Sequence, residues 1–181
     1  MAKSRKSSSK EKTPYFLAMA RIALGLTFLW AFFDKLMGLG FATCRNPKTS
    51  EVVMYCEKAW VNGGSPTSGF LQNAVKGPFA DFYQSLAGNA FIDGLFMAGL
   101  FLIGFALVAG IGMRIATISG VVLMMMMWSA SLFPSNNPIL DEHIIYSIIL
   151  LALLASNKQQ VWGLRNWWVA QPAAKQFPIL E

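Results

Sequence analysis

Apolar residues are concentrated in four long segments of the chain, and polar connections separate them. A helix needs about 20 residues to cross a hydrocarbon core of roughly 30 Å, and each segment approaches that length. The pattern therefore predicts an all-α membrane protein, a four-helix transmembrane bundle. The predicted spans cover residues 14–36, 91–112, 115–133 and 139–156.

The polar connections predict how the remainder of the chain is organised. Residues 1–13 form a basic tail that we expect to be disordered, residues 14–157 form the membrane domain, and residues 158–181 lie along the membrane interface. The connection of residues 37–90 is a long loop between the first two spans. Apolar positions recur in it at helical spacing, which predicts short helices lying at the interface. These positions are Leu71, Val75, Phe79, Phe82 and Leu86.

Composition supports a membrane protein. The chain is 55% hydrophobic and 13% charged, whereas a typical soluble domain carries about 25% charged residues. This balance argues against a soluble enzyme. The first apolar segment is too long for the h-region of a cleaved signal peptide, so we expect it to remain as a span.

Positive charge predicts the orientation. Four spans place both termini on one side, and cytoplasmic segments are enriched in Lys and Arg. The N-terminal tail is basic, Arg114 lies in the short second connection, and Lys158, Arg165 and Lys175 follow the last span. We therefore predict a multi-pass protein of the cytoplasmic membrane with both termini in the cytoplasm. Nucleic acid is not an expected partner, because no reading element accompanies the basic run.

The last span is short, and titratable residues directly precede it. Residues 144–155 rise only about 18 Å as a helix, less than the hydrocarbon thickness. To span, this helix has to draw Asp141, Glu142 and His143 to the outer boundary of the membrane. Charge at that depth is costly unless it is paired.

Polar partners are expected at the same depth. Asp34 and Lys35 end the first span, Asp93 begins the second, and Trp30 and Trp128 lie near the outer ends of their spans. We predict an outward-facing polar pocket in which Lys35 pairs with Asp141 or Glu142, close to His143. Asp34, Trp30, Asp93 and Trp128 are expected to position a head group or substrate in it. Histidine is the side chain best suited to exchange protons near neutral pH. The alternative is ordinary helix chemistry, because acids favour the first turn of a helix.

Arg21 is a charge inside the first span. Arg21, Gly25, Phe28, Phe32 and Lys35 are spaced to share one helix face. This face is expected to look into the bundle, with Gly25 allowing close helix packing. Arg21 either holds an anionic head group or extends to the inner interface.

Cys44 and Cys56 both lie in the long loop. Outside the cytoplasm a disulfide is permitted, and closing a loop of this size stabilises by about 3 kcal/mol in the chain-entropy model. The pair is a structural staple or a redox-active pair, and two free thiols are the remaining alternative. The spacing is not the C-x-x-C that depresses the pKa of a thiol.

Several motifs resemble the DoxX/DoxD family of small four-helix membrane proteins. They are "RIALGLTFLWAFFDKL", "GGSPTSGFL", "KGPFADFYQSLAG", and the pair "NNPILDEHIIY" and "WGLRNWW". Some members are named as subunits of thiosulfate:quinone oxidoreductase. The resemblance places Arg21, Gly25 and Lys35 on the family's first-helix pattern and Asp141 and His143 on its fourth-helix pattern.

The resemblance implies a quinone-linked oxidoreductase subunit that acts on a small sulfur compound. His143, with Asp141 or Glu142, would manage protons, Lys35 would offset charge, and Arg21 would position a head group. No haem, flavin or metal motif is present in the sequence, so a membrane quinone, a partner's cofactor or the Cys44–Cys56 pair would accept the electrons. The expected partners are the lipid bilayer and either a redox subunit or a second copy of the chain. Two alternatives are a non-catalytic accessory or scaffold subunit and a binder or carrier of a small lipophile.

Overall fold

The computed structural model describes residues 8–46, 48–134 and 137–180. These residues form helices and connecting loops, and no β-strand is found among them beyond two isolated bridges. The all-α prediction is therefore confirmed. The four longest helices are α1 (Ser8–Met37), α4 (Ala90–Ala109), α5 (Met113–Ala130) and α6 (Glu142–Ala155).

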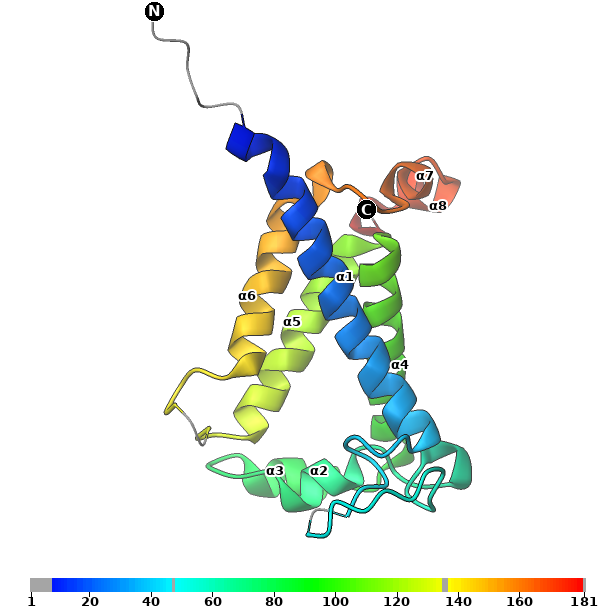
Figure 1. Cartoon of the computed structure of the whole chain (residues 1–181), viewed down its shortest axis with the longest axis vertical. Helices are drawn as coiled ribbons and strands as arrows, with labels where there is room; N and C mark the ends of the chain where they lie inside the picture. The colour runs from blue at the N-terminus through cyan, green and yellow to red at the C-terminus, as the bar shows by residue number, and fades with distance from the viewer. Residues whose placement is uncertain (1–7, 47, 135–136, 181) are drawn as a thin grey trace, which may run out of the picture.

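The four long helices lie side by side (Figure 1). Helix α1 packs mainly against α4, α4 packs against α5, and α5 packs against α6. The segment between α1 and α4 covers one end of the bundle, which we call the loop end. The start of α1 and the C-terminal helices α7 (Arg165–Val169) and α8 (Pro172–Gln176) lie at the other end, which we call the terminal end.

Three helices are long and apolar enough to cross a membrane: 12–37 within α1, α4 and α5. Large apolar side chains are exposed on their outer surfaces, including Leu26, Leu102 and Val122. Lipid is the solvent that such surfaces require, so these helices indicate a membrane protein. Helix α6 is apolar but has 14 residues, which corresponds to a rise of about 21 Å.

Several helix boundaries differ from the predicted ones. Helix α5 ends at Ala130, whereas the predicted span reached residue 133. Residues 8–13 belong to α1, whereas we predicted that they form a disordered tail; residues 1–7 of that tail lie outside the described residues. Helix α4 ends at Ala109, because Gly110 adopts a left-handed conformation with φ of 72°. Helix α6 begins at Glu142, three residues later than predicted, because Asp141 caps it in an extended conformation.

The bundle core is apolar, and α1 and α4 approach each other through glycine. A Cβ atom on Gly25 would lie 2.9 Å from the Gly104 carbonyl oxygen, and one on Gly104 would lie 2.9 Å from the Gly25 oxygen. The prediction that Gly25 allows close packing is confirmed. The buried core cluster consists of Leu24, Phe28, Met97, Leu100, Ile103, Leu107, Met113, Met124, Leu150 and Leu153.

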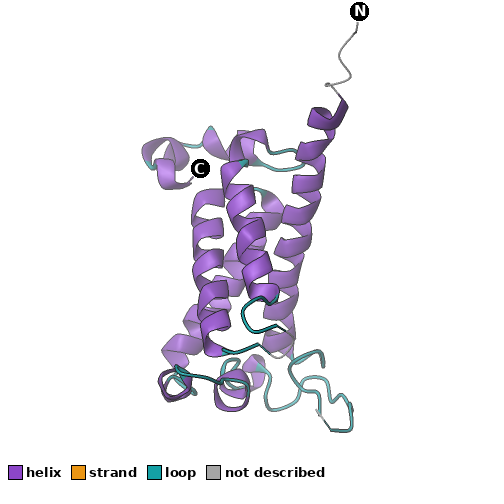
Figure 2. Ribbon diagram, turned by 90° about the vertical axis from the view of Figure 1, so that its left-hand side faces the viewer, coloured by secondary structure: helices purple, strands orange, loops and turns teal. Residues whose placement is uncertain are grey.

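The loop end contains three short helices, η1 (Trp60–Asn62), α2 (Ser68–Asn73) and α3 (Ala80–Ser85), which lie across the bundle (Figures 1 and 2). Helix η1 contacts α1, whereas α3 and the connection between α2 and α3 are held to the end of α5. The Lys76 N–H donates to the Ala130 carbonyl at 2.9 Å, and the Tyr83 hydroxyl lies 2.7 Å from the Ser129 hydroxyl. Leu71 and Val75 pack with Tyr83 and Ala130 in a second, small core.

Candidate functional site

Asp34 and Lys35 stand side by side in the last turns of α1, but they have different roles. The Asp34 carboxylate is 1% exposed. It accepts hydrogen bonds from the backbone N–H groups of Phe41, Ala42 and Thr43 at 2.9, 3.0 and 3.0 Å. Asp34 therefore holds the chain that leaves α1 in a tight turn. Its charge is stabilised by backbone donors rather than left available to a ligand.

Lys35 points away from that turn and towards α4. Its Nζ lies 5.9 Å from the centre of the Phe96 ring, within the range of a cation–π contact. The side chain is half-buried and lines a cavity of about 860 Å³ at the loop end. Small-molecule sites typically occupy about 300–1,000 Å³. We call this the loop-end cavity.

The loop-end cavity is lined mostly by apolar residues, and most of its charged lining residues are exposed. Helices α4 and α5 contribute Ile92, Phe96, Leu123, Met126, Met127 and Ala130, and the loop contributes Phe70, Leu71, Tyr83 and Leu86. The charged lining residues are Lys35, Arg45, Lys58 and Glu57. Three cations and one carboxylate leave an excess of positive charge. The cavity therefore suits a molecule with an apolar body and an acidic head group.

Asp93 supports one wall of this cavity. Its carboxylate is 5% exposed and accepts from the Ser65 hydroxyl at 2.9 Å and from the Thr67 hydroxyl at 2.6 Å. The Thr67 N–H donates to the same oxygen at 3.2 Å. Ser65 and Thr67 line the cavity, so Asp93 fixes the loop against the start of α4. We predicted that Asp93 positions a ligand; its contacts make it a support for the lining residues.

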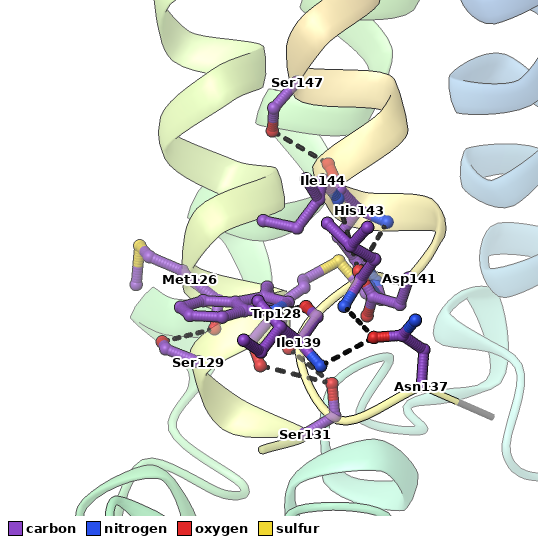
Figure 3. A network of polar contacts seen from close by, with 12 residues as sticks. Met126, Trp128, Ser129, Ser131, Asn137, Ile139, Asp141, His143, Ile144 and Ser147 are labelled. Carbon is purple, nitrogen blue, oxygen red and sulfur yellow. Dashed lines mark hydrogen bonds and ion pairs between the residues drawn. The ribbon is translucent and has the colours of Figure 1, made fainter. Parts of the chain in front are cut away.

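Asp141 and His143 form a pair at the start of α6 (Figure 3). The Asp141 Oδ1 accepts from the backbone N–H groups of His143 and Ile144 at 3.0 and 3.2 Å, which caps the helix. The Asp141 Oδ2 lies 2.8 Å from the His143 Nδ1. Side-chain exposure is 10% for Asp141 and 13% for His143. The structure thus brings these two predicted residues together, while Glu142 is exposed.

Polar groups of α5 and of the segment before α6 lie near this pair, among apolar side chains (Figure 3). The Trp128 indole donates to the Ile139 carbonyl at 2.8 Å. The Asn137 side chain accepts from the N–H groups of Ile139 and Leu140, both at 2.9 Å. Trp128 therefore fixes the segment that leads into α6. Trp30 is 50% exposed and stacks edge-on against Phe41, 6.1 Å away, outside the loop-end cavity.

The predicted ion pair between Lys35 and Asp141 or Glu142 is absent from the described part of the chain. Nor do Asp141, Glu142 and His143 line the loop-end cavity that contains Lys35. The reason lies in the packing. Helix α1 packs against α4 and turns Lys35 towards Phe96, whereas α6 packs against α5 and uses Asp141 as its cap. The single pocket that we predicted is two separate places.

Arg21 occupies the terminal end of the bundle, far along α1 from Lys35. It is 1% exposed. Its Nη1 donates to the carbonyls of Leu107 and Val108 at 2.5 and 3.1 Å, and its Nη2 donates to those of Val161 and Trp162 at 3.3 and 2.8 Å. We predicted that Arg21 either holds a head group or extends to the inner interface. Its contacts are instead with backbone carbonyls of the protein. Arg21 caps the C-terminus of α4 and ties it to the segment after α6.

Cys44 and Cys56 form a disulfide with a Cα–Cα distance of 5.6 Å. Cys44 lines the loop-end cavity, as do its neighbours Thr43 and Arg45 on one side of the bond and Glu57 and Lys58 on the other. The disulfide therefore joins two segments of the cavity wall. This placement supports a structural role for the disulfide, which is to hold the cavity wall together. A redox role for the pair stays a prediction.

Sequence inspection missed several lining residues. Arg45, Lys58 and Phe96 line the cavity and were not among the predicted site residues. The local structure of the loop could be predicted, because "NGGSPTSGFL" indicates turns followed by an apolar helix. No periodicity, however, indicates that these turns fold back over α4 and α5. Comparison of the chain with protein-family models, curated proteins and solved structures found no match.

Proposed function

We propose that this chain is a multi-pass membrane protein that binds a small amphipathic molecule with an acidic head group in the loop-end cavity. The observation that carries the proposal is the position of Lys35. This lysine is half-buried beside Phe96, at the wall of a cavity of about 860 Å³ whose lining is mostly apolar. Asp34, its neighbour in sequence, is occupied by backbone donors. Lys35 is thus placed to meet an anionic group of a ligand.

The membrane placement belongs to the same proposal. Helix α6 crosses as a fourth span, with Ile139 and Leu140, which are 61% and 56% exposed, carrying its apolar length to the outer boundary. The loop end faces outward and both termini are cytoplasmic, in keeping with the excess of Lys and Arg near the terminal end. The membrane is the cytoplasmic membrane. In this orientation a lipophile reaches the cavity from the outer leaflet.

Binding of palmitate to the purified full chain in neutral detergent tests the proposal, with hexadecanol as a matched ligand that lacks the carboxylate. We expect palmitate to bind at least tenfold more tightly than hexadecanol, which corresponds to about 1.4 kcal/mol. Lys35→Met should abolish this preference, and Lys35→Arg should retain most of it. Lys76→Met is the matched control, because Lys76 is exposed at the same end and does not line the cavity.

Two results would contradict the proposal. One is equal affinity for palmitate and hexadecanol in the unaltered protein. The other is a Lys35→Met variant that unfolds at the unaltered temperature and binds palmitate as well as before.

A second candidate function is a DoxX-type subunit of a quinone-linked oxidoreductase acting on a small sulfur compound. The observation that favours it is the hydrogen-bonded pair of Asp141 and His143, little exposed, at the same end of the bundle as a cavity large enough for a quinone ring. In this proposal His143 exchanges protons near the outer boundary. The quinone is bound by the cavity, and a partner subunit or a second copy supplies what the chain lacks.

Reduction of decylubiquinone by thiosulfate or sulfite tests this second function, with His143→Ala and Asp141→Asn as variants. We expect turnover in the unaltered protein and a loss of at least tenfold in each variant. Absence of turnover and of bound quinone in a folded protein would leave the accessory or scaffold role. Turnover unchanged in His143→Ala would remove the proposed proton step.

A further inference from the structure

A second cavity, of about 230 Å³, lies at the terminal end of the bundle. It is formed where α6 ends, where η2 (Asn157–Gln159) follows it, and where α5 and α7 begin. We call it the terminal-end pocket. It shares no lining residue with the loop-end cavity.

Three cations from three different elements line the terminal-end pocket. Arg114 comes from the first turn of α5, Lys158 from η2 and Arg165 from the start of α7. No carboxylate side chain is among the lining residues in the described ranges of the chain. The Arg114 Nη1 donates to the Pro178 carbonyl at 3.1 Å, so the C-terminal segment helps to hold this arginine in place.

The C-terminus of α6 is one reason for cations to gather here, because a helix terminus carries about half a negative elementary charge. Arg114 and Arg165 each also contact other groups of the protein, and both line the pocket beside Lys158. They are brought together by the folding of the chain after α6, since Arg114 is separated from the other two by most of α5 and all of α6.

An exposed apolar stripe leads along α6 to the pocket. Ile145, Ile148, Ala152 and Ala155 are exposed, and their spacing of three, four and three residues places them on one helix face. Ala155 also lines the pocket, as does Leu154. The pocket is therefore polar where the cations lie and continuous with an apolar surface on its other side.

We propose that the terminal-end pocket binds the phosphate group of an anionic phospholipid, whose acyl chains lie along the exposed stripe of α6. Arginine matches a phosphate with two parallel hydrogen bonds, and lysine adds a point charge. Basic pockets between transmembrane helices on the cytoplasmic side are suited to anionic lipid head groups. The inference rests on the proposed membrane placement and not on the ligand of the loop-end cavity. The apolar stripe favours a lipid over free phosphate.

Native mass spectrometry of the full chain, purified in neutral detergent, tests the proposal. The probes are dioleoyl phosphatidylglycerol, dioleoyl phosphatidylcholine and inorganic phosphate. We expect one phosphatidylglycerol to be retained at a concentration at which phosphatidylcholine is retained at least fivefold less. The triple variant Arg114→Gln, Lys158→Gln, Arg165→Gln should lower phosphatidylglycerol retention at least tenfold.

A matched pair of single variants guards against a folding defect in the triple variant. Lys158 and Lys175 are both exposed at the terminal end, but only Lys158 lines the pocket. We expect Lys158→Gln to lower retention of phosphatidylglycerol about threefold and Lys175→Gln to leave it unchanged. The basic residues at the start of the chain are present in both, so non-specific attraction of lipid is held constant.

Three results would overturn the inference. The first is unchanged retention of phosphatidylglycerol in the folded triple variant. The second is an equal effect of Lys158→Gln and Lys175→Gln, which would indicate general attraction of anionic lipid. Displacement of the lipid by millimolar inorganic phosphate would identify free phosphate, rather than a phospholipid, as the ligand. Palmitate binding at the other end is measured separately and is expected to be unaffected by all of these variants.

Discussion

Two buried charged side chains of this protein form hydrogen bonds with its own backbone. Arg21 donates to four carbonyls at the terminal end, and Asp34 accepts from three N–H groups at the loop end. Both residues invite a ligand-binding interpretation when only the sequence is read. In the fold each one forms hydrogen bonds with backbone groups where a helix ends. Such backbone groups are costly to leave without a hydrogen bond in a low-dielectric environment. Lys35 is the charge of α1 that remains turned towards a cavity.

Replacement of Arg21 should affect stability rather than ligand binding. We expect Arg21→Met to lower the free energy of unfolding by about 3 kcal/mol, because the carbonyls at the end of α4 and after α6 lose their donors. Arg21→Lys should recover little, since an ammonium cannot reach both segments with two parallel donors. Thermal unfolding in detergent measures the change. If Arg21→Met reduced palmitate affinity with an unchanged unfolding temperature, the anchoring role would be wrong.

Asp141 serves two purposes that two substitutions separate. Asp141→Ala removes the cap of α6 and should cost about 1 kcal/mol. Asp141→Asn keeps an oxygen acceptor for the His143 N–H and should be nearly as stable as the unaltered protein. Thermal unfolding distinguishes the two. Equal stability of the alanine and asparagine variants would show that the cap contributes little, and the pair with His143 would then be its main role.

At the scale of elements, the close approach of α1 and α4 orients Lys35 towards Phe96. Gly25 and Gly104 let the two backbones meet, and the residues above them on α1 and α4 then face each other at the loop end. Packing of this kind is driven by close van der Waals contact, because lipid offers no hydrophobic force between helices. Helix α6 packs mainly against α5 and only to a small extent against α1, and its first residue is capped by Asp141, so Asp141 and Lys35 do not meet.

A methyl group at this crossing should be destabilising. We expect Gly104→Ala to lower stability by about 1–3 kcal/mol, because its Cβ would lie 2.9 Å from the Gly25 oxygen and from Leu29. Gly99→Ala, on the same helix, is the matched control, since a Cβ there meets no atom within 4 Å. It should be neutral or slightly stabilising through its higher helix propensity. Similar losses in both variants would indicate that helix entropy, and not the crossing, decides the outcome.

At the scale of the whole molecule, the segment between α1 and α4 closes one end of the bundle and completes a cavity that the four long helices do not form alone. The segment is attached at the end of α1 by Asp34, at the start of α4 by Asp93 and at the end of α5 by Lys76 and Tyr83. The disulfide between Cys44 and Cys56 joins two parts of its wall. The loop is thus a folded cover rather than a flexible connection.

Removal of the disulfide tests this cover. The double variant Cys44→Ser, Cys56→Ser should be less stable by about 3 kcal/mol in the chain-entropy model. Because the bonded segments line the loop-end cavity, palmitate affinity should fall as well, while retention of phosphatidylglycerol at the terminal end stays the same. Parallel binding measurements check both. Loss of lipid retention together with palmitate affinity would mean that the whole bundle, and not the loop, has been disturbed.

The sequence alone determined the coarse architecture. Long apolar segments predict helices because backbone polar groups in lipid must be satisfied within the segment, and this holds whatever the tertiary packing is. Gly25 was predicted to be a packing residue because a small side chain lets two membrane helices approach closely. The loop was expected to contain short helices because its apolar positions recur at helical spacing. The spacing of Asp141 and His143 in one turn also made their contact foreseeable, since they are neighbours in the chain.

Only the tertiary structure decided which charges meet. The depth of a side chain in the membrane can be estimated from helix rise, but the partner it faces depends on which helices pack together and how each is rotated. That rotation follows from contacts such as Gly25 with Gly104, which are distant in sequence. As a result Lys35 lies apart from Asp141, and Arg21 donates hydrogen bonds to backbone carbonyls. Arg114, Lys158 and Arg165 line one pocket. The physical reason is that these contacts join residues far apart in the sequence, and such contacts produce no periodic pattern from which they could be predicted.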